Sequence, residues 1–131
     1  MTTTKYFYGV GRRKTSTARC KFFAEGEELL ITVNKRPMKE FFPDFYAQNI
    51  VIALHNMAIT TGVVELHVRG GGTSSQSEAC RLAITKSLVK KDEGNKVIAR
   101  MHGYMTTDPR QVLPKKAGFR KARKVEQWSK R

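Results

Sequence analysis

The sequence predicts an α+β fold: a small mixed sheet with helices on one face, followed by an extended basic arm. Two observations support this prediction. Short segments of alternating apolar and polar residues, typical of half-buried strands, are interleaved with longer segments whose apolar residues recur at helical spacing. After position 109 the sequence contains nine basic residues and one acidic residue. No apolar face that could be buried in a core can be recognised in this segment. We therefore expect a body at residues 1–106 and an extended basic C-terminal tail at residues 107–131.

Strands are expected in three places. Apolar and polar residues alternate over residues 17–22, 29–33 and 64–69. Gly26 makes a turn between the first two segments, which predicts that they pair as an antiparallel hairpin. In the first segment the polar positions include Arg19 and Lys21, so the open face of this strand is predicted to carry basic groups.

Helices are expected between and after these strands. Pro37 suits the first turn of a short helix that Pro43 ends, and Asp44 suits the cap of the next helix. One face of that next helix is apolar, with Tyr46, Ile50, Ala53, Leu54 and Met57. Ser75 and Glu78 fit a capping box before a helix whose inner face holds Cys80, Ala83, Ile84, Ser87 and Leu88. A last short helix is expected over residues 96–102, ended by Gly103.

The charge of the chain points to a polyanionic partner. The sequence holds 25 Lys and Arg against 11 Asp and Glu, for a formal net charge of +14. A charge of this size says little about the fold, but it favours binding to nucleic acid or to an acidic membrane surface. Since no apolar run is long enough to span a bilayer and the N-terminus lacks the apolar core of a signal peptide, we expect no membrane partner.

Catalytic and metal chemistry are not expected. The two cysteines, Cys20 and Cys80, show no metal-binding or disulfide spacing, which suits a reducing cytoplasm. The three histidines show no ligand spacing, and no nucleophile with its base or pair of carboxylates stands out. The expectation is therefore a protein that is not an enzyme, with no cofactor, no metal and no small-molecule substrate.

The first basic motif is "GRRKTSTARCK", residues 11–21. Basic and hydroxyl side chains in a turn and a strand can hold successive phosphates, which receive many of the contacts in nucleic-acid complexes. The residues predicted to bind RNA here are Arg12, Arg13, Lys14, Thr15 and Arg19. The alternative is a solvated strand edge, where lysines prevent aggregation; the high charge of the whole chain favours binding.

The second motif, "RGGGTSSQ", leads from a strand into a helix. Glycines let the backbone approach an anion, and the start of a helix offers free N–H groups and a positive dipole end. The Lys of a P-loop and the spacing of a dinucleotide fingerprint are both absent, so a nucleotide site is disfavoured against a tight turn. An RNA phosphate remains a plausible ligand, with Arg69, Gly70, Gly71, Gly72 and Gln76 predicted to contact it.

The third motif is the tail itself. Its basic residues are predicted to bind RNA phosphates: Arg110, Lys115, Lys116, Arg120, Lys121, Arg123 and Lys124. Phe119 and Trp128 can stack on bases. The alternative, a charged end without function, does not account for two aromatic residues in a segment that has no core to bury them.

In this order, "YGVGRRKTSTAR", "VRGGGTSSQSEACRLAITKSL", "DPRQVLPKKAGFRKAR" and the final "WSKR" resemble the small-subunit ribosomal protein nine family of bacterial type, over nearly the whole chain. The resemblance implies a ribosomal S5 domain 2-like fold with a left-handed β-α-β crossover. It also implies a place in the head of the small ribosomal subunit in the cytoplasm, with small-subunit ribosomal RNA, P-site tRNA and neighbouring ribosomal proteins as partners. By position, Ser129, Lys130 and Arg131 match the tail tip that contacts P-site tRNA.

Two other functions stay open at this point. The chain could be an RNA-processing enzyme or the protein subunit of one, or a free nucleic-acid-binding module that acts outside any ribosome. An enzyme should show clustered acids or a metal site, and the sequence shows neither. Co-migration with small ribosomal subunits separates both from the ribosomal function.

Overall fold

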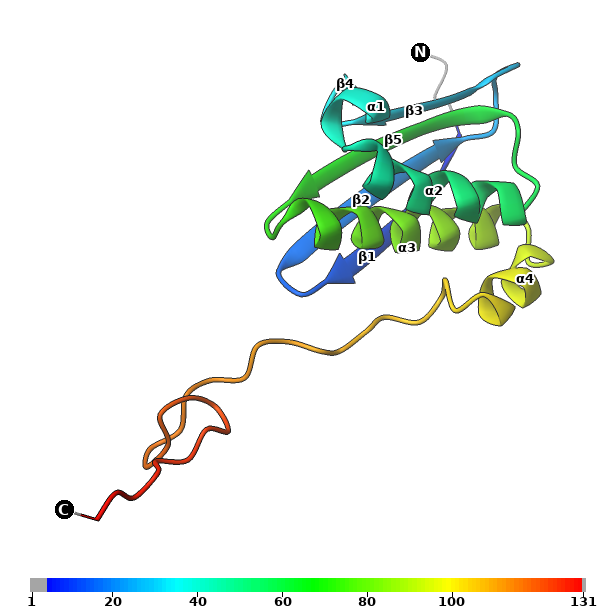
Figure 1. Cartoon of the computed structure of the whole chain (residues 1–131). Helices are drawn as coiled ribbons and strands as arrows, with labels where there is room; N and C mark the ends of the chain where they lie inside the picture. Colours follow the sequence, from blue (N-terminus) through cyan, green and yellow to red (C-terminus); the bar gives the residue numbers. More distant parts are fainter. Residues whose placement is uncertain (1–4, 131) are drawn as a thin grey trace.

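Five strands form one mixed sheet in the order β1-β2-β5-β3-β4 in the computed structural model, which describes residues 5–130 (Figure 1). The strands are β1 (Tyr6–Arg13), β2 (Ser16–Phe23), β3 (Leu29–Val33), β4 (Arg36–Pro37) and β5 (Gly62–Arg69). The helices are α1 (Met38–Phe41), α2 (Asp44–Asn56), α3 (Thr73–Lys91) and α4 (Asn95–Met101). The predicted α+β fold, with a small mixed sheet, is confirmed.

The predicted hairpin between residues 17–22 and 29–33 is wrong. β2 pairs with β1 through the tight turn at Lys14 and Thr15, and on its other side with β5, both antiparallel. β3 instead pairs in parallel with β5, with Leu29 opposite Gly62 and Val33 opposite Leu66. The prediction failed because residues 6–23 form two strands with a turn between them. Lys14 makes this turn with a positive φ of 52°. No Gly or Asn stands next to it in the sequence to signal a turn.

The connection from β3 to β5 runs through α1 and α2. Viewed with these two strands pointing upward and the helices toward the viewer, β5 lies to the left of β3, so the crossover is left-handed (Figure 1). Most such connections are right-handed. The arrangement agrees with the S5 domain 2-like fold that the resemblance implied.

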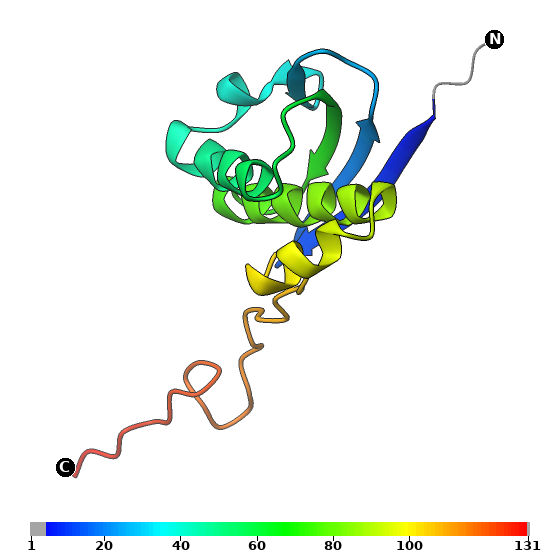
Figure 2. The ribbon, with the colours of Figure 1, turned by 90° about the vertical axis from the view of Figure 1, so that its right-hand side faces the viewer.

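Helices α2 and α3 cover one face of the sheet, and the core lies between them and the strands (Figure 2). All five residues predicted for the inner face of α3 are buried, as are Ile50, Ala53 and Leu54 of α2 and Met57 directly after it. The closest approach is between β1 and α3. A Cβ atom at Gly11 would lie 2.0 Å from the Ala79 carbonyl oxygen, and one at Gly9 would lie 2.1 Å from that of Ala83. Two glycines therefore set how closely this strand packs on the helix.

The predicted N-terminal caps of the two longer helices are wrong. α3 begins at Thr73, so Ser75 lies inside the first turn, where its Oγ accepts a hydrogen bond from the Gly72 N–H at 3.2 Å. Asp44 is the first residue of α2 and its side chain makes no capping hydrogen bond. In both helices the flanking residue, Gly72 or Pro43, takes the cap position, so the polar residue in the sequence marked the first turn and not the cap itself.

After α4 the described chain, up to residue 130, contains no further helix or strand except an isolated bridge between Phe119 and Val125. The segment leads away from the sheet and helices and ends far from them (Figure 1). The division between residues 106 and 107 stays a prediction. Over residues 5–130, none of the helices has the length and apolar character that a membrane crossing requires.

Candidate nucleic-acid interface

Two basic motifs that are far apart in the sequence lie side by side in the structure. Ser16, just after the β1–β2 turn, donates a hydrogen bond from its Oγ to the Gly70 carbonyl at 2.9 Å, and this Oγ also lies 2.8 Å from Ser75 Oγ. Gly70 and Gly71 have φ angles of 78° and 67°. A Cβ atom at Gly70 would lie 2.5 Å from the Thr15 carbonyl oxygen. These glycines thus allow the two turns to touch.

Between the turns lies a shallow cavity of about 290 Å³ at the start of α3. It is lined by Arg13, Lys14, Thr15, Gly71, Gly72, Ser74, Ser75 and Glu78. Gly72 has a negative φ, and a Cβ atom there would meet nothing within 4 Å, so packing does not require this glycine. The cavity combines an exposed lysine with the free N–H groups of a helix start, an arrangement suited to a phosphate.

Gln76, also predicted to bind RNA, contacts the backbone of the glycine turn. Its Nε2 donates a hydrogen bond to the Gly70 carbonyl at 3.0 Å. The amide therefore holds the glycine turn in place, and direct contact of Gln76 with RNA stays a prediction.

The face of the sheet that the helices leave open forms a second basic surface. Arg19 lies opposite His67, and Thr17 lies opposite Arg69, in the β2–β5 pairing. A cavity of about 480 Å³ on this face is lined by Tyr8, Thr17, Arg19, Lys21, Asn34, His67, Val68 and Arg69. Basic groups beside aromatic rings suit an RNA backbone with its bases.

Tyr8 and His67 are among the residues of this open face that the predicted RNA-binding set did not include. His67 alternates with Arg69 along β5, and Tyr8 lies opposite Lys21 in the β1–β2 pairing. The alternation in β5 was a signal for His67. Tyr8 required knowledge of the strand pairing, because a period of two shows which residues share a face but not which strand lies next to them.

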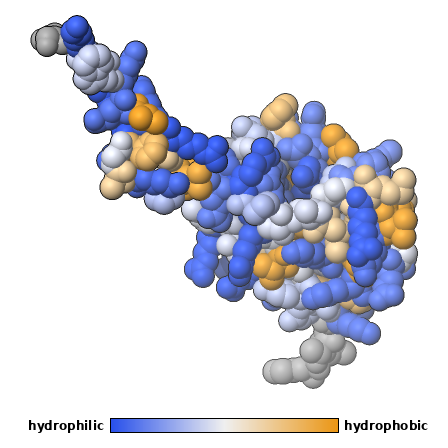
Figure 3. Space-filling model, turned by 90° about the horizontal axis from the view of Figure 1, so that it is seen from below, coloured by the Kyte–Doolittle hydropathy of each residue, from blue (hydrophilic) through white to orange (hydrophobic). Residues whose placement is uncertain are grey.

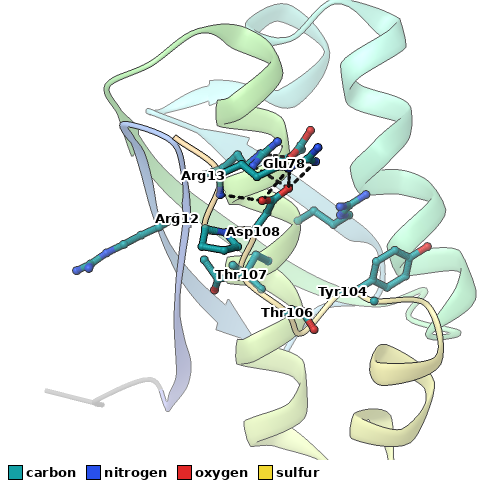
Figure 4. A pocket seen from close by; sticks show the side chains of 12 residues that line it. Arg12, Arg13, Glu78, Tyr104, Thr106, Thr107 and Asp108 are labelled. Atoms are coloured by element: carbon teal, nitrogen blue, oxygen red, sulfur yellow. Dashed lines mark hydrogen bonds and ion pairs between the residues drawn. The ribbon is translucent and has the colours of Figure 1, made fainter. Parts of the chain in front are cut away.

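Arg13 differs from its neighbours in the first motif because carboxylates surround it (Figure 4). Its Nε lies 2.7 Å from Glu78 Oε2, and its Nη1 lies 2.9 Å from Asp108 Oδ2 as an ion pair without hydrogen-bond alignment. The Arg13 side chain is only 12% exposed. It therefore joins β1, α3 and the beginning of the arm, and its predicted contact with RNA remains untested.

Arg110 completes this cluster. Its Nη2 lies 2.7 Å from Asp108 Oδ2, and its backbone N–H donates to Asp108 Oδ1 at 2.9 Å. These hydrogen bonds from Arg110, together with its charge and that of Arg13, hold the pKa of the Asp108 carboxyl well below its usual range. In return, the same carboxylate raises the pKa of the Arg110 guanidinium. Asp108 thus fixes the first residues of the arm against the body.

The remaining basic residues of the arm are exposed, and hydrophilic residues dominate its surface (Figure 3). They are Lys115, Lys116, Arg120, Lys121, Arg123 and Lys124. Trp128 is 81% exposed. Of the predicted tip, Ser129 and Lys130 are exposed, and Arg131 lies outside the described residues. The arm therefore presents positive charge and an aromatic ring with no protein surface to bury them.

The sequence comparisons identify the family. The sequence model of ribosomal protein S9/S16 matches residues 11–131. The chain belongs to the ribosomal protein S9/S16 family. It is 43% identical over 125 residues to the small ribosomal subunit protein uS9 of Parabacteroides distasonis, an alignment that covers 93% of this chain and 95% of that relative. The resemblance found in the sequence motifs is confirmed.

Membership in the S9/S16 family makes the chain a structural ribosomal protein and not an enzyme, located in the ribosome in the cytoplasm. Translation and RNA binding within a ribonucleoprotein follow from the same family. This excludes the RNA-processing enzyme that the sequence alone left open.

The two cysteines of this S9/S16 protein belong to its core. Both are free and buried, and Cys20 Sγ lies 3.4 Å from Ser87 Oγ. Burial raises the pKa of the Cys20 thiol to about 12 and that of the Cys80 thiol further still. Thiols held protonated in this way act as small apolar groups.

Proposed function

We propose that the chain is a structural constituent of the small ribosomal subunit, in its head, where it binds small-subunit ribosomal RNA and touches P-site tRNA with the tip of its tail. The observation that carries the proposal is the contact between the β1–β2 turn and the glycine turn at the start of α3. It gathers Lys14, the glycine backbone and a helix N-terminus into one anion-binding surface. The relative from Parabacteroides distasonis is a small ribosomal subunit protein, which supports the choice of subunit.

The body binds RNA through two adjoining surfaces. Arg12 and Lys14 are exposed at the β1–β2 turn, while Arg19 and Arg69 are exposed on the open face of the sheet. Each side chain that neutralises a phosphate releases a counterion, so binding weakens as salt rises. We expect the body to recognise the shape and backbone of folded RNA, with few contacts to base edges.

The tail extends this binding into the RNA. Fully extended, the last seventeen residues span roughly 55–60 Å. Their positive charge opposes a compact state of the free protein and is neutralised by RNA phosphates. Ser129, Lys130 and Arg131 are then the residues that reach the tRNA, with a planar guanidinium at Arg131 suited to two phosphate oxygens.

Ribosomal RNA binding is tested with a triple variant, Arg12→Ala, Lys14→Ala and Arg19→Ala. We expect the dependence of log affinity on log salt to flatten by roughly 0.7–0.9 for each phosphate that the variant no longer neutralises. The measurement is binding to a fragment of the subunit-head RNA over a salt series. Lys39, Lys96 and Arg100, which are exposed on α1 and α4, provide a control variant with the same change of charge. If both variants change the slope equally, the binding is unspecific and this surface carries no special role.

The tRNA contact is tested by deleting residues 129–131. The free terminal carboxylate repels phosphate, and most tRNA affinity comes from codon pairing and ribosomal RNA. We therefore expect the deletion to weaken P-site binding by about 1 kcal/mol while assembly stays intact. Arg131→Lys should recover only part of this affinity because the planar fork is gone. The measurement is tRNA dissociation from programmed small subunits, and equal rates across a range of salt would show that the tip does not touch tRNA.

A further inference from the structure

One hollow on the described surface is lined mostly by apolar side chains. We call it the apolar groove: a hollow of about 590 Å³ between α2 and the outer edge of β3, lined by Leu29, Ile31, Val51, Leu54, His55, Ala58, Ile59 and Thr60. Leu30, Val51 and Ile52, in or beside it, are 59%, 49% and 52% exposed. Apolar side chains concentrated around a hollow mark a contact site more often than a free surface.

The charge around the apolar groove argues against RNA as its ligand. The groove is built from residues 22–34 and 44–62, and neither segment contains a single Lys or Arg, although the chain holds 25 of them. Glu25, Glu27 and Glu28 are exposed and come directly before Leu29, the first residue of the groove along the chain. A phosphate backbone would meet repulsion here, whereas a positively charged partner would be attracted.

The edge of the sheet beside the apolar groove is open. β4 pairs only with Thr32 and Val33 of β3. Within the described residues, no strand pairs with residues 29–31 on their outer side, so their outward N–H and C=O groups are free to bind an added strand (Figure 1). Leu29 and Ile31 line the hollow, while Leu30 between them does not. A strand added at this edge would therefore place every second side chain in the groove.

We propose that the apolar groove docks an extended segment of another protein of the small subunit, apolar at alternate positions and flanked by Lys or Arg. The segment pairs with the edge of β3, fills the groove with its apolar side chains, and places its basic residues against Glu27 and Glu28. This mode of recognition combines backbone hydrogen bonds with pockets for alternate side chains. The inference rests on the proposed function, because it assumes that the chain is placed among other small-subunit proteins.

A photo-crosslinking amino acid in place of Val51 tests the inference in purified small subunits. Val51 is half exposed on α2 and lines the groove, so the fold tolerates the replacement. We expect a crosslink to one protein, at a peptide with alternating apolar residues and adjacent Lys or Arg, identified by mass spectrometry. The same crosslinker in place of Arg19, on the open face of the sheet, is the control and should label RNA. Crosslinks from position 51 to RNA or to a second copy of this chain, or no crosslink, would overturn the inference.

A charge substitution gives a second, independent readout. Val51→Glu places an acid in the groove, and we expect the crosslinked protein to be retained roughly tenfold more weakly in salt-washed subunits. Val97→Glu is the matched control, because Val97 is 64% exposed on α4, outside the groove. Equal retention with both variants would contradict the docking site. Absence of the wild-type chain from small subunits would refute the proposed function itself, which separates the two failures.

Discussion

Replacing Gly11 with Ala tests the close packing of β1 against α3. Gly11 lies on β1 where the strand crosses α3, and a Cβ atom there would lie 2.0 Å from the Ala79 carbonyl oxygen and 2.6 Å from the Ala83 nitrogen. Both are backbone atoms of a buried helix, so no side-chain rotation relieves the overlap. The strand and the helix must move apart, or the strand must bend.

The size of the effect follows from this geometry. Ordinary contact begins at 3.4 Å, so the carbonyl must retreat by about 1.4 Å. A gap of about 1 Å already forfeits up to half of the dispersion energy of the atoms along the interface. Ala79 and Ala83 are fully buried, and overpacking at such sites typically costs about 1–3 kcal/mol and sometimes more. Since two backbone atoms overlap, we expect a decrease of about 3 kcal/mol in the free energy of unfolding.

Urea unfolding of the purified protein, followed by far-ultraviolet circular dichroism, measures this decrease. With an m-value of about 1–3 kcal/mol/M, the midpoint should fall by at least about 1 M urea. Gly94→Ala is the control, because Gly94 has helical dihedral angles and its new Cβ would meet only the Asp92 side chain at 3.3 Å. That variant should be neutral or slightly stabilised. If Gly11→Ala unfolds within about 0.5 kcal/mol of wild type with an unchanged m-value, the packing argument is wrong.

Three further predictions concern the arm and the core. Asp108→Ala should release the start of the arm, and the Arg110 amide should then exchange its hydrogen faster. Because the pKa of Asp108 is lowered in the folded protein, the wild-type interaction should persist at about pH 5. It should break only as the pH falls through that lowered pKa. Slow exchange in the variant would show that Asp108 does not hold the arm. Cys20 and Cys80 should resist alkylation in the native protein at about pH 8 and react in urea, because burial keeps both thiols protonated; rapid native labelling, detected by mass spectrometry, would contradict their burial. Trp128, the single tryptophan, should change its fluorescence when RNA binds but hardly at all when urea unfolds the free protein, and the reverse result would place its ring against the body.

Local structure and the chemistry of the surfaces could be predicted from the sequence. The buried faces of helices and strands followed from periodicity, because the residues on one side of an element recur at a regular spacing along the sequence. The basic motifs and the excess charge after position 109 indicated RNA without any knowledge of the fold, and the combined motifs led to the S9/S16 family. These features depend on residues that are close together along the chain.

Which segments meet was settled by long-range packing alone. A period of two shows the buried face of a strand but not its neighbour, so β2 was wrongly paired with β3 when its partners are β1 and β5. Arg13 resembles Arg12 in the sequence, yet the fold places it between Glu78 and Asp108. The apolar groove likewise arises from two segments that lack basic residues and that the left-handed crossover brings together. Contacts between residues that are distant in the sequence depend on how the whole core packs, so they cannot be predicted from local sequence patterns.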